Sequence, residues 1–465
     1  MKIRFFGAAG NVTGSRFFLE SKNSRLLIDC GLYQERQFIA RNWDAFPVSP
    51  LMIDNVVLTH AHIDHCGYLP KFVKDGFKGK IFCTEPTADI AKIALLDSAR
   101  LQEDDAEFKR KRHRKEGRAG RYPVVPLYTV NDARDVFGLF APVAYDEGVN
   151  AADNIKVVFH DAGHILGASM IEIRVEEDGK VKKCIFSGDI GRWEKPILKD
   201  PSVFENADYV FMESTYGNRL HGNIENSVEK LRKIIVNTAQ KGGNIIIPVF
   251  GIERAQELLY WVNLLLKENK IPPLVVFLDS PMAIDVTKVF KKYPEYFDEE
   301  TKNLVESGES PFGFSLLKTI SSINESKAIN SIKGSSIIMA GSGMCTGGRI
   351  KHHLVNNIAR PESTIVFVGY QAEGTLGRQI LERPKKVRIF GHNHRVSARI
   401  EKINGFSAHA DKNELLKWVS HFKNNPQKIF IIHGEKNVAR EFASVLSGVV
   451  SSQIIVPDYL EEHFL

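Results

Sequence analysis

Cysteine is scarce in this chain of 465 residues, which has five, and no two of them form a CxxC pair. A scattered, odd set of thiols argues against a disulfide framework and against a structural zinc site built on cysteine. Such a set is typical of reduced proteins, so we expect a cytoplasmic location. No apolar run reaches the roughly 18 residues of a membrane-spanning helix, and the opening MKIRFFGAAGN lacks the apolar core of a signal peptide. We therefore expect no membrane association.

Strong charge and internal repeats are also missing. The net charge is +6, with 43% apolar and 25% charged residues, which permits a nucleic-acid partner without requiring one. The length exceeds one ordinary core and predicts two or three domains. One segment departs from this balance: KRKRHRKEGRAGR, residues 109–121. Two interpretations stay open for it, a site for the phosphate backbone of a nucleic acid and a solvated loop or helix extension.

Histidine, by contrast, is concentrated in LTHAHIDHCGYLP, residues 58–70, directly after an apolar run. In an extended backbone His60, His62 and Asp64 would point to one side and His65 to another, so one loop would supply two neighbouring metal ions. Imidazole and carboxylate ligands suit Zn²⁺ and, less well, Mn²⁺ or Fe²⁺. Two ions need more ligands, and further candidates end later apolar strands: His164, Asp189 and His433.

Short apolar strands also organise the rest of the chain. Up to about residue 216 they dominate, and several end in polar residues. From about residue 217 strands alternate with helices, which predicts a parallel α/β unit.

Several motifs resemble those of a known family. THAHIDHCGYLP, DAGHILGAS and SGDIG resemble the successive motifs of the metallo-β-lactamase fold, and LLIDCG supplies the aspartate of its first motif, Asp29. MESTYG, GFSAHADK and IIHGEKN resemble the A, B and C motifs of the β-CASP nucleases. The resemblance covers nearly the whole chain, in family order. It implies an α/β protein in which residues 1–205 and 396–465 form a metallo-β-lactamase αββα sandwich. A β-CASP α/β domain of residues 206–395 would be inserted into it, with the active site in the cleft between them.

The resemblance also implies roles for the metal-ligand candidates. His60, His62 and His164 would hold a first zinc ion, and Asp64, His65 and His433 a second. Asp189 would bridge the two ions, and Asp29 would orient the histidine loop. Two zinc ions can position a phosphodiester and activate a water for attack on phosphorus. The products would then carry a 5′-phosphate and a 3′-hydroxyl.

Proton donation is the second half of this chemistry. His409 of FSAHADK would protonate the leaving alkoxide as a general acid, and Glu213 of MESTYG would orient that imidazole and favour its charged form. Taken alone, SAHADKNE also fits a helix start at which His409 helps to satisfy free backbone amides. Within the family, a histidine in the last motif marks the RNA-processing branch.

Glycine-rich and polar turns after later strands are the remaining candidates. AGSGMCTGGRI, residues 340–350, offers many backbone N–H groups and fits either a phosphate cradle or an ordinary tight turn. In the resembling family such turns face the cleft. We therefore expect RNA contacts from Arg254, Ser280, Ser342, Gly343 and Arg378. The expected function is a zinc-dependent endonuclease acting on single-stranded RNA. A 5′-to-3′ exonuclease with the same centre, a small-ester hydrolase and a silent RNA-binding subunit remain alternatives, and the family resemblance allows a homodimer.

Overall fold

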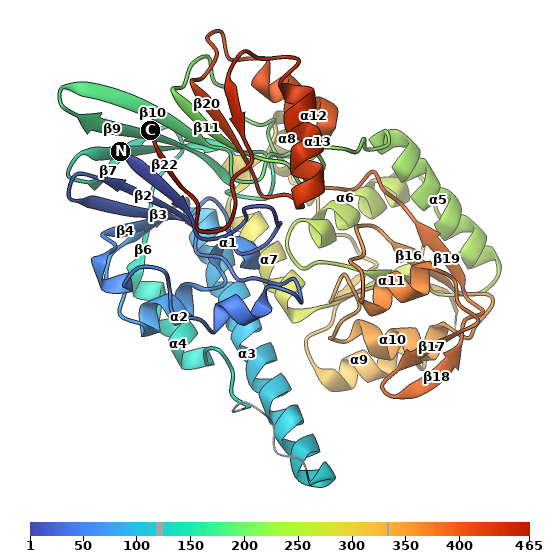
Figure 1. Cartoon of the computed structure of the whole chain (residues 1–465). Helices are drawn as coiled ribbons and strands as arrows, with labels where there is room; N and C mark the ends of the chain where they lie inside the picture. Colours follow the sequence, from blue (N-terminus) through green and yellow to red (C-terminus); the bar gives the residue numbers. More distant parts are fainter. Residues whose placement is uncertain (118–123, 333) are drawn as a thin grey trace. The chain divides into compact units, whose positions relative to one another are not determined.

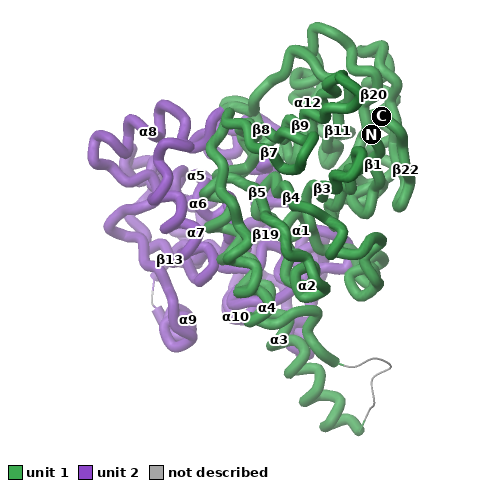
Figure 2. Tube along the Cα trace, turned by 90° about the vertical axis from the view of Figure 1, so that its left-hand side faces the viewer, with its two compact units in different colours: residues 1–194, 200–220, 409–465 green, residues 195–199, 221–408 purple. Residues whose placement is uncertain are grey.

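The computed structural model describes residues 1–117, 124–332 and 334–465, so part of the basic segment 109–121 lies outside the described residues. The chain folds into two compact units, drawn in two colours in Figure 2. Unit 1 comprises residues 1–194, 200–220 and 409–465. Unit 2 comprises residues 195–199 and 221–408.

Unit 1 contains two seven-stranded sheets. The strand order of the first sheet is β22 (Glu462–Phe464), β1 (Lys2–Phe5), β2 (Phe17–Ser21), β3 (Ser24–Ile28), β4 (Asn55–Val57), β5 (Ile81–Cys83) and β6 (Phe140–Pro142). The order of the second is β21 (Gln453–Ile455), β20 (Lys428–Ile432), β11 (Tyr209–Glu213), β10 (Lys180–Phe186), β9 (Ser169–Glu177), β8 (Ile155–Asp161) and β7 (Gly148–Ala152).

Apolar side chains from both sheets form one core in unit 1. Strand β1 shows the pattern behind it: Ile3 and Phe5 are fully buried, and Lys2 and Arg4, which alternate with them, are half-buried. The rings of Phe186, Phe211 and Phe430 stack in a row across three neighbouring strands, with centroid separations of 4.1 and 4.8 Å. The two sheets therefore face each other across an apolar layer.

Helices cover the outer sides of this pair of sheets. Beside the first sheet lie α1 (Ile63–Cys66), α2 (Leu69–Lys74), α3 (Glu85–Glu116) and α4 (Val130–Asp135), and beside the second lie α12 (Lys412–Val419) and α13 (Lys436–Leu446) (Figure 1). Helix α3 contacts β6, and α13 contacts β20 and β21. Short 3₁₀ turns span Ile39–Asn42, Pro50–Met52 and Phe137–Leu139. The predicted αββα sandwich is confirmed.

Helix α3 runs into the basic segment. The Thr84 hydroxyl caps its start by accepting the N–H of Thr87, and Gly117 ends it in the left-handed conformation, with φ of 62°. Residues 109–116 are thus an exposed helix extension, with His113 the one half-buried position. Residues 118–121 lie outside the described residues.

Unit 2 is built on a parallel sheet of six strands. Their order is β14 (Leu317–Thr319), β13 (Val275–Asp279), β15 (Ser336–Ala340), β12 (Ile245–Pro248), β16 (Thr364–Phe367) and β19 (Arg399–Lys402). A hairpin of β17 (Lys386–Ile389) and β18 (His392–Arg395) packs on its core. The helices are α5 (Ile224–Gln240), α6 (Arg254–Lys267), α7 (Pro281–Lys292), α8 (Glu299–Glu306), α9 (Ile323–Ile329), α10 (Ile350–Asn357) and α11 (Leu376–Leu381), and a 3₁₀ turn spans Pro294–Tyr296. The central strands β12, β13 and β15 are almost wholly buried, as both faces of a parallel sheet must be.

The limits of the inserted unit differ from the expected 206 and 395. Strand β11 pairs with β10 and β20 and so belongs to unit 1, which moves the start to residue 221. Strand β19 pairs with β16 and extends unit 2 to residue 408. Both strands are short and carry no signal in sequence that tells one sheet from the other.

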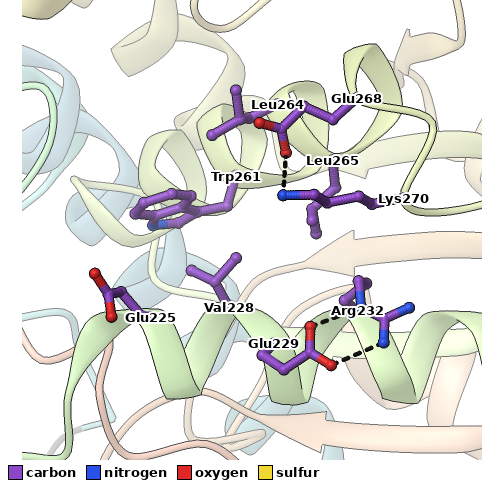
Figure 3. A pocket seen from close by; sticks show the side chains of 9 residues that line it. All are labelled: Glu225, Val228, Glu229, Arg232, Trp261, Leu264, Leu265, Glu268 and Lys270. Carbon is purple, nitrogen blue, oxygen red and sulfur yellow. Dashed lines mark hydrogen bonds and ion pairs between the residues drawn. The ribbon is translucent and has the colours of Figure 1, made fainter.

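A groove of about 480 Å³ lies between α5 and α6 of unit 2 (Figure 3). Val228, Trp261, Leu264 and Leu265 form its apolar surface, and the ion pairs Glu268–Lys270 and Glu229–Arg232 lie at its rim. Its described lining includes none of the candidate site residues. Within residues 1–117, 124–332 and 334–465, no helix combines the length and apolar character needed to cross a membrane.

Candidate metal centre

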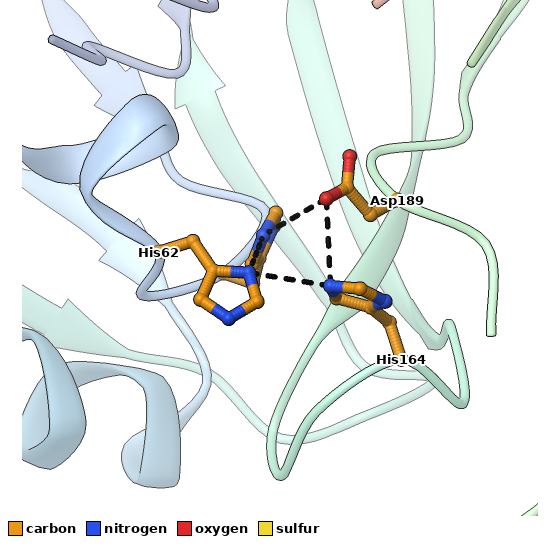
Figure 4. A group of neighbouring side chains, drawn as sticks. His62, His164 and Asp189 are labelled. Carbon is orange, nitrogen blue, oxygen red and sulfur yellow. Dashed lines mark hydrogen bonds and ion pairs between the residues drawn. The ribbon is translucent and has the colours of Figure 1, made fainter. Parts of the chain in front are cut away.

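Four donor atoms converge just beyond the ends of β4, β8 and β10 in unit 1. The Nε2 atom of His60 lies 3.1 Å from Nδ1 of His62, which lies 3.2 Å from Nε2 of His164. Oδ2 of Asp189 lies 3.4 Å from Nε2 of both His60 and His164. Figure 4 shows His62, His164 and Asp189 turned toward one common point.

A second group shares the same aspartate. Oδ1 of Asp189 lies 3.3 Å from Nε2 of His65. That nitrogen lies 3.1 Å from Nε2 of His433, which lies 3.5 Å from Oδ2 of Asp64. The two carboxylate oxygens of Asp189 therefore face different groups, the geometry expected of a bridging ligand.

These spacings fit metal ions. Zinc ligands at 2.0–2.1 Å in a tetrahedron lie about 3.3 Å from one another, close to the separations just given. Oδ1 of Asp189 is buried without a hydrogen-bond partner in the described part of the chain, which a cation would remedy. Seven imidazole and carboxylate donors, with no thiol among them, suit zinc.

Protonation states favour the same conclusion. Burial, followed by the neighbouring His65, lowers the pKa of His60 to about 3, and burial lowers the pKa of His62 to about 4. Burial likewise holds the pKa of His164 well below its ordinary value. Burial opposes charge on Asp189, but His433 and His65 outweigh it and keep the pKa of that carboxyl well below normal. The first group therefore presents neutral imidazoles around an ionised carboxylate, the state that binds a cation. In the second group burial opposes charge on His65, but Asp189 and Asp29 outweigh it and raise the pKa of that ring, so a cation bound there would displace a proton.

Hydrogen bonds fix which ring nitrogen faces each group. Nδ1 of His65 donates to Asp29 at 2.7 Å, which leaves Nε2 for the cluster. The Thr59 hydroxyl lies 3.0 Å from Nδ1 of His60 and donates to Asp29. On the far side, the Thr215 hydroxyl accepts from Nδ1 of His433 at 3.0 Å and donates to the carbonyl of the same residue. The orienting role expected of Asp29 thus has a geometric basis.

Thr59 and Thr215 were not singled out from the sequence. Each adjoins a motif residue, in LTHAH and MESTYG, which is the one sequence signal available.

The path of the histidine loop differs from the extended backbone expected. The chain is extended only as far as His62, and α1 begins at Ile63, so Asp64 and His65 project from a helical turn. Asp64 and His65 both face the second group, so the change from extended chain to helical turn after His62 divides the donors, and the expected alignment of Asp64 with His60 and His62 is wrong.

His409 lies beside the clusters and bonds to a buried glutamate. Its Nδ1 is 3.2 Å from Oε1 of Glu213, which is fully buried. Burial opposes the charge, but Glu213 and Asp189 outweigh it and raise the pKa of His409 to about 9. The cap of α12 is made instead by Asp411, whose carboxylate accepts the N–H groups of Asn413 and Glu414. The helix-cap interpretation of His409 is therefore wrong.

The five expected RNA contacts all lie in unit 2, after adjacent strands of its sheet. Ser280 is 8% exposed and caps α7, and Arg254 is 8% exposed at the start of α6. Ser342 is half-buried, its hydroxyl accepting backbone N–H groups of its own loop. Gly343 is buried, and Arg378 is half-buried on α11, paired with Glu382. Ser342 and Arg378 are the more accessible of the set.

Known families match both units. A metallo-β-lactamase superfamily domain matches residues 18–207, a Beta-Casp domain residues 255–380, and a Zn-dependent metallo-hydrolase RNA specificity domain residues 393–457. Ribonuclease TTHA0252 of Thermus thermophilus is 35% identical over 436 residues, 94% of each chain. This chain belongs to the β-CASP ribonuclease family. The recognition made from its motifs is confirmed, and the chain is a nuclease.

Other members of the β-CASP family are similar over nearly the whole of this chain. Transcription termination factor FttA of Methanocaldococcus jannaschii is 31% identical over 99% of this chain and 71% of its own length. An RNase J-like protein of the same organism is 31% identical over 98% of this chain and 97% of its own. Among solved structures, a protein of unknown function from Enterococcus faecalis V583 covers 100% of this chain and 99% of its own, with a TM-score of 0.54 and 13% identity. That last likeness shows the fold alone.

Proposed function

We propose that the chain is a zinc-dependent endoribonuclease that hydrolyses single-stranded RNA to leave 5′-phosphate and 3′-hydroxyl ends. The observation that carries this is the pair of donor groups joined at Asp189, with His409 and Glu213 against them. The names of the relatives, Ribonuclease TTHA0252 and RNase J-like protein, and the RNA specificity domain support RNA as the substrate.

The donors would be shared between two zinc ions according to the two groups that the interatomic distances define. His60, His62 and His164 would hold one and Asp64, His65 and His433 the other, with Asp189 shared. When bound, such ions would activate a water and offset charge that develops on the phosphoryl oxygens. Asp29, Thr59 and Thr215 would keep the ligand rings in the required orientation.

His409 would supply the proton. As water oxygen bonds to phosphorus, the bond from phosphorus to the 3′-oxygen breaks, and that oxygen takes a proton from Nε2 of His409. Glu213 accepts from Nδ1 of the same ring, which orients it and stabilises its charged form. Phosphorus stays on the downstream fragment as its new 5′-phosphate, and the 2′-hydroxyl is not consumed because water is the nucleophile.

RNA would also contact the loops that follow the strands of unit 2. We keep Arg254, Ser280, Ser342, Gly343 and Arg378 in this role, supported by their positions after the parallel strands, where α/β sheets bind ligands. Of these, Ser342 and Arg378 offer accessible polar atoms. A homodimer and a cytoplasmic location stay predictions.

Circular RNA separates the endonuclease from the 5′-to-3′ exonuclease. The metal-loaded protein should convert an unstructured circle into a linear molecule, because no free end is required. The same preparation acting on a 5′-phosphorylated linear RNA but leaving the circle intact would make the chain an exonuclease. A thioester turned over with both RNAs intact would instead indicate a small-ester hydrolase. The Asp189→Ala variant is the control for a contaminating nuclease, since it lacks the ligand that both donor groups share.

A further inference from the structure

Three loops at one end of the unit 2 sheet meet around the ring of Phe250. Strands β15, β12 and β16 are neighbours in the sheet, and the loops that follow them begin at Gly341, Val249 and Val368. The side chain of Gln371, in the last loop, donates to the carbonyl of Gly343 in the first, at 2.9 Å. The loop that follows β12 carries Phe250.

Phe250 is 42% exposed, whereas Val249 and Ile252 on either side are 0% and 5% exposed. Burying a phenylalanine normally stabilises a fold, and the ring of Phe250 is instead presented to solvent by a turn with several fixed points. The turn is fixed at three points. The N–H of Val249 donates to Ala340 at 3.0 Å, and Gln256 donates to the carbonyl of Gly251 at 3.3 Å. Beyond them, the Glu253 carboxylate pairs with Lys195 at 3.0 Å, both buried.

Glycine forms the seat of the ring. A methyl group at Gly343 would lie 2.6 Å from Cδ2 and Cε2 of Phe250, and one at Gly369 would lie 3.9 Å from Cε2. Backbone therefore approaches the ring where any side chain at Gly343 would collide with it. The hydroxyl of Ser342 lies next to this seat in sequence and is half-buried.

We infer that Phe250, seated on Gly343, is a stacking site for one nucleobase of single-stranded RNA. This rests on the proposed function, which provides the RNA. An aromatic face held open at the strand ends of a parallel sheet suits a flat base, and stacking accepts any of the four bases. The site would help to hold the strand without reading its sequence.

Abasic nucleotides placed one at a time along a short single-stranded RNA test the stacking. Binding is measured by anisotropy in chelator, so that nothing is cut. In the unmodified protein one abasic position should weaken binding about 5- to 150-fold, the range for loss of a stacked base. In Phe250→Ala the intact RNA should bind that much more weakly, and the same abasic position should cost nothing further. Phe250→Tyr should restore the pattern.

Phe390→Ala is the matched control, because Phe390 is 49% exposed in the same unit. In this variant the abasic nucleotide should weaken RNA binding as much as it does in the unmodified protein. Gly343→Ala tests the same site from the backbone that supports the ring. The added methyl group displaces the ring of Phe250, so the loss of affinity caused by the abasic nucleotide should become smaller, while the melting temperature changes little.

The inference is overturned if the abasic nucleotide weakens binding to Phe250→Ala as much as it weakens binding to the unmodified protein. It is also overturned if Phe250→Ala binds the intact RNA as tightly as the unmodified protein does. Unchanged RNA binding with loss of self-association in sedimentation would show that the ring binds a protein instead, which also overturns it. If the abasic nucleotide weakens RNA binding as expected but no RNA is cut after metal is restored, the proposed function is refuted and the stacking site is not.

Discussion

Replacing His409 with alanine tests the proton donor, and the structure indicates that the fold would tolerate the change. Glu213 would keep two donors, the N–H groups of Ile190 at 2.6 Å and Thr215 at 3.3 Å. The backbone beside His409 is held independently, since the N–H of Ala410 donates to Ile190 at 2.8 Å. Thermal melting of His409→Ala should therefore stay close to that of the unmodified protein.

Loss of a general acid should slow cleavage about 10²- to 10⁴-fold. The assay compares ordinary RNA with RNA in which sulfur replaces the 3′-oxygen at one phosphodiester, under single turnover. A thiolate leaves without a proton, so His409→Ala should lose that factor on ordinary RNA and regain most of it on the sulfur substrate. His421→Ala, at a half-buried histidine of unit 1 that lies outside both donor groups, should behave as the unmodified protein on both.

The pH dependence of cleavage should also distinguish ordinary RNA from the sulfur substrate. In the metal-free chain the pKa of His409 is about 9, and bound cations would oppose the imidazolium and move it lower. Activity on ordinary RNA should fall as pH rises through that pKa, and the sulfur substrate should show no such fall. Glu213→Gln removes a charge that raises this pKa, so its decline should begin at lower pH. Equal loss by His409→Ala on both substrates would refute proton donation and point to a role in metal binding.

Three further predictions concern the metal centre. Asp189→Asn removes charge from both donor groups and should lower the content of both ions, measured by elemental mass spectrometry; full retention of two ions would contradict the bridging role. Thr215→Val should weaken metal retention against a chelator about 10- to 100-fold, whereas Thr215→Ser should not, because only the hydroxyl orients His433; equal retention by the two would exclude orientation. The metal-free chain should lose stability as pH falls from about 6.5 toward 4, because His62, with a folded pKa of about 4, takes up its proton more readily when unfolded; chemical denaturation of His62→Gln should show a smaller loss over that window, and an identical loss would contradict the depressed pKa.

The convergence of these donors was largely predictable because each closely follows a short apolar strand or lies in one compact motif. His60 and His62 lie three and five residues past the end of β4, and His433 directly follows β20. The helical turn that carries His65 was not predictable, since HIDH fits both an extended loop and a helix start. Tertiary contacts with Asp29 decide the orientation of that ring.

Other features depend on contacts that no local pattern reports. Strand β11 is a short apolar run like those of unit 2, and only its pairing with β10 and β20 assigns it to unit 1. In SAHADKNE both His409 and Asp411 are candidate caps, and the hydrogen bonds choose Asp411. Phe250 continues the apolar run NIIIPVF, which predicts burial, and only the fixed turn places its ring outside.

Cleavage of a circular RNA in water labelled with ¹⁸O tests the central claim most directly. Mass spectrometry of the product should find a linear RNA with a 3′-hydroxyl and a 5′-phosphate that carries one ¹⁸O atom. Such a product requires an internal cut, with water as the nucleophile and the 3′-oxygen as the leaving group. An intact circle, or a product ending in an unlabelled 2′,3′-cyclic phosphate and a 5′-hydroxyl, would contradict the proposed hydrolytic endonuclease.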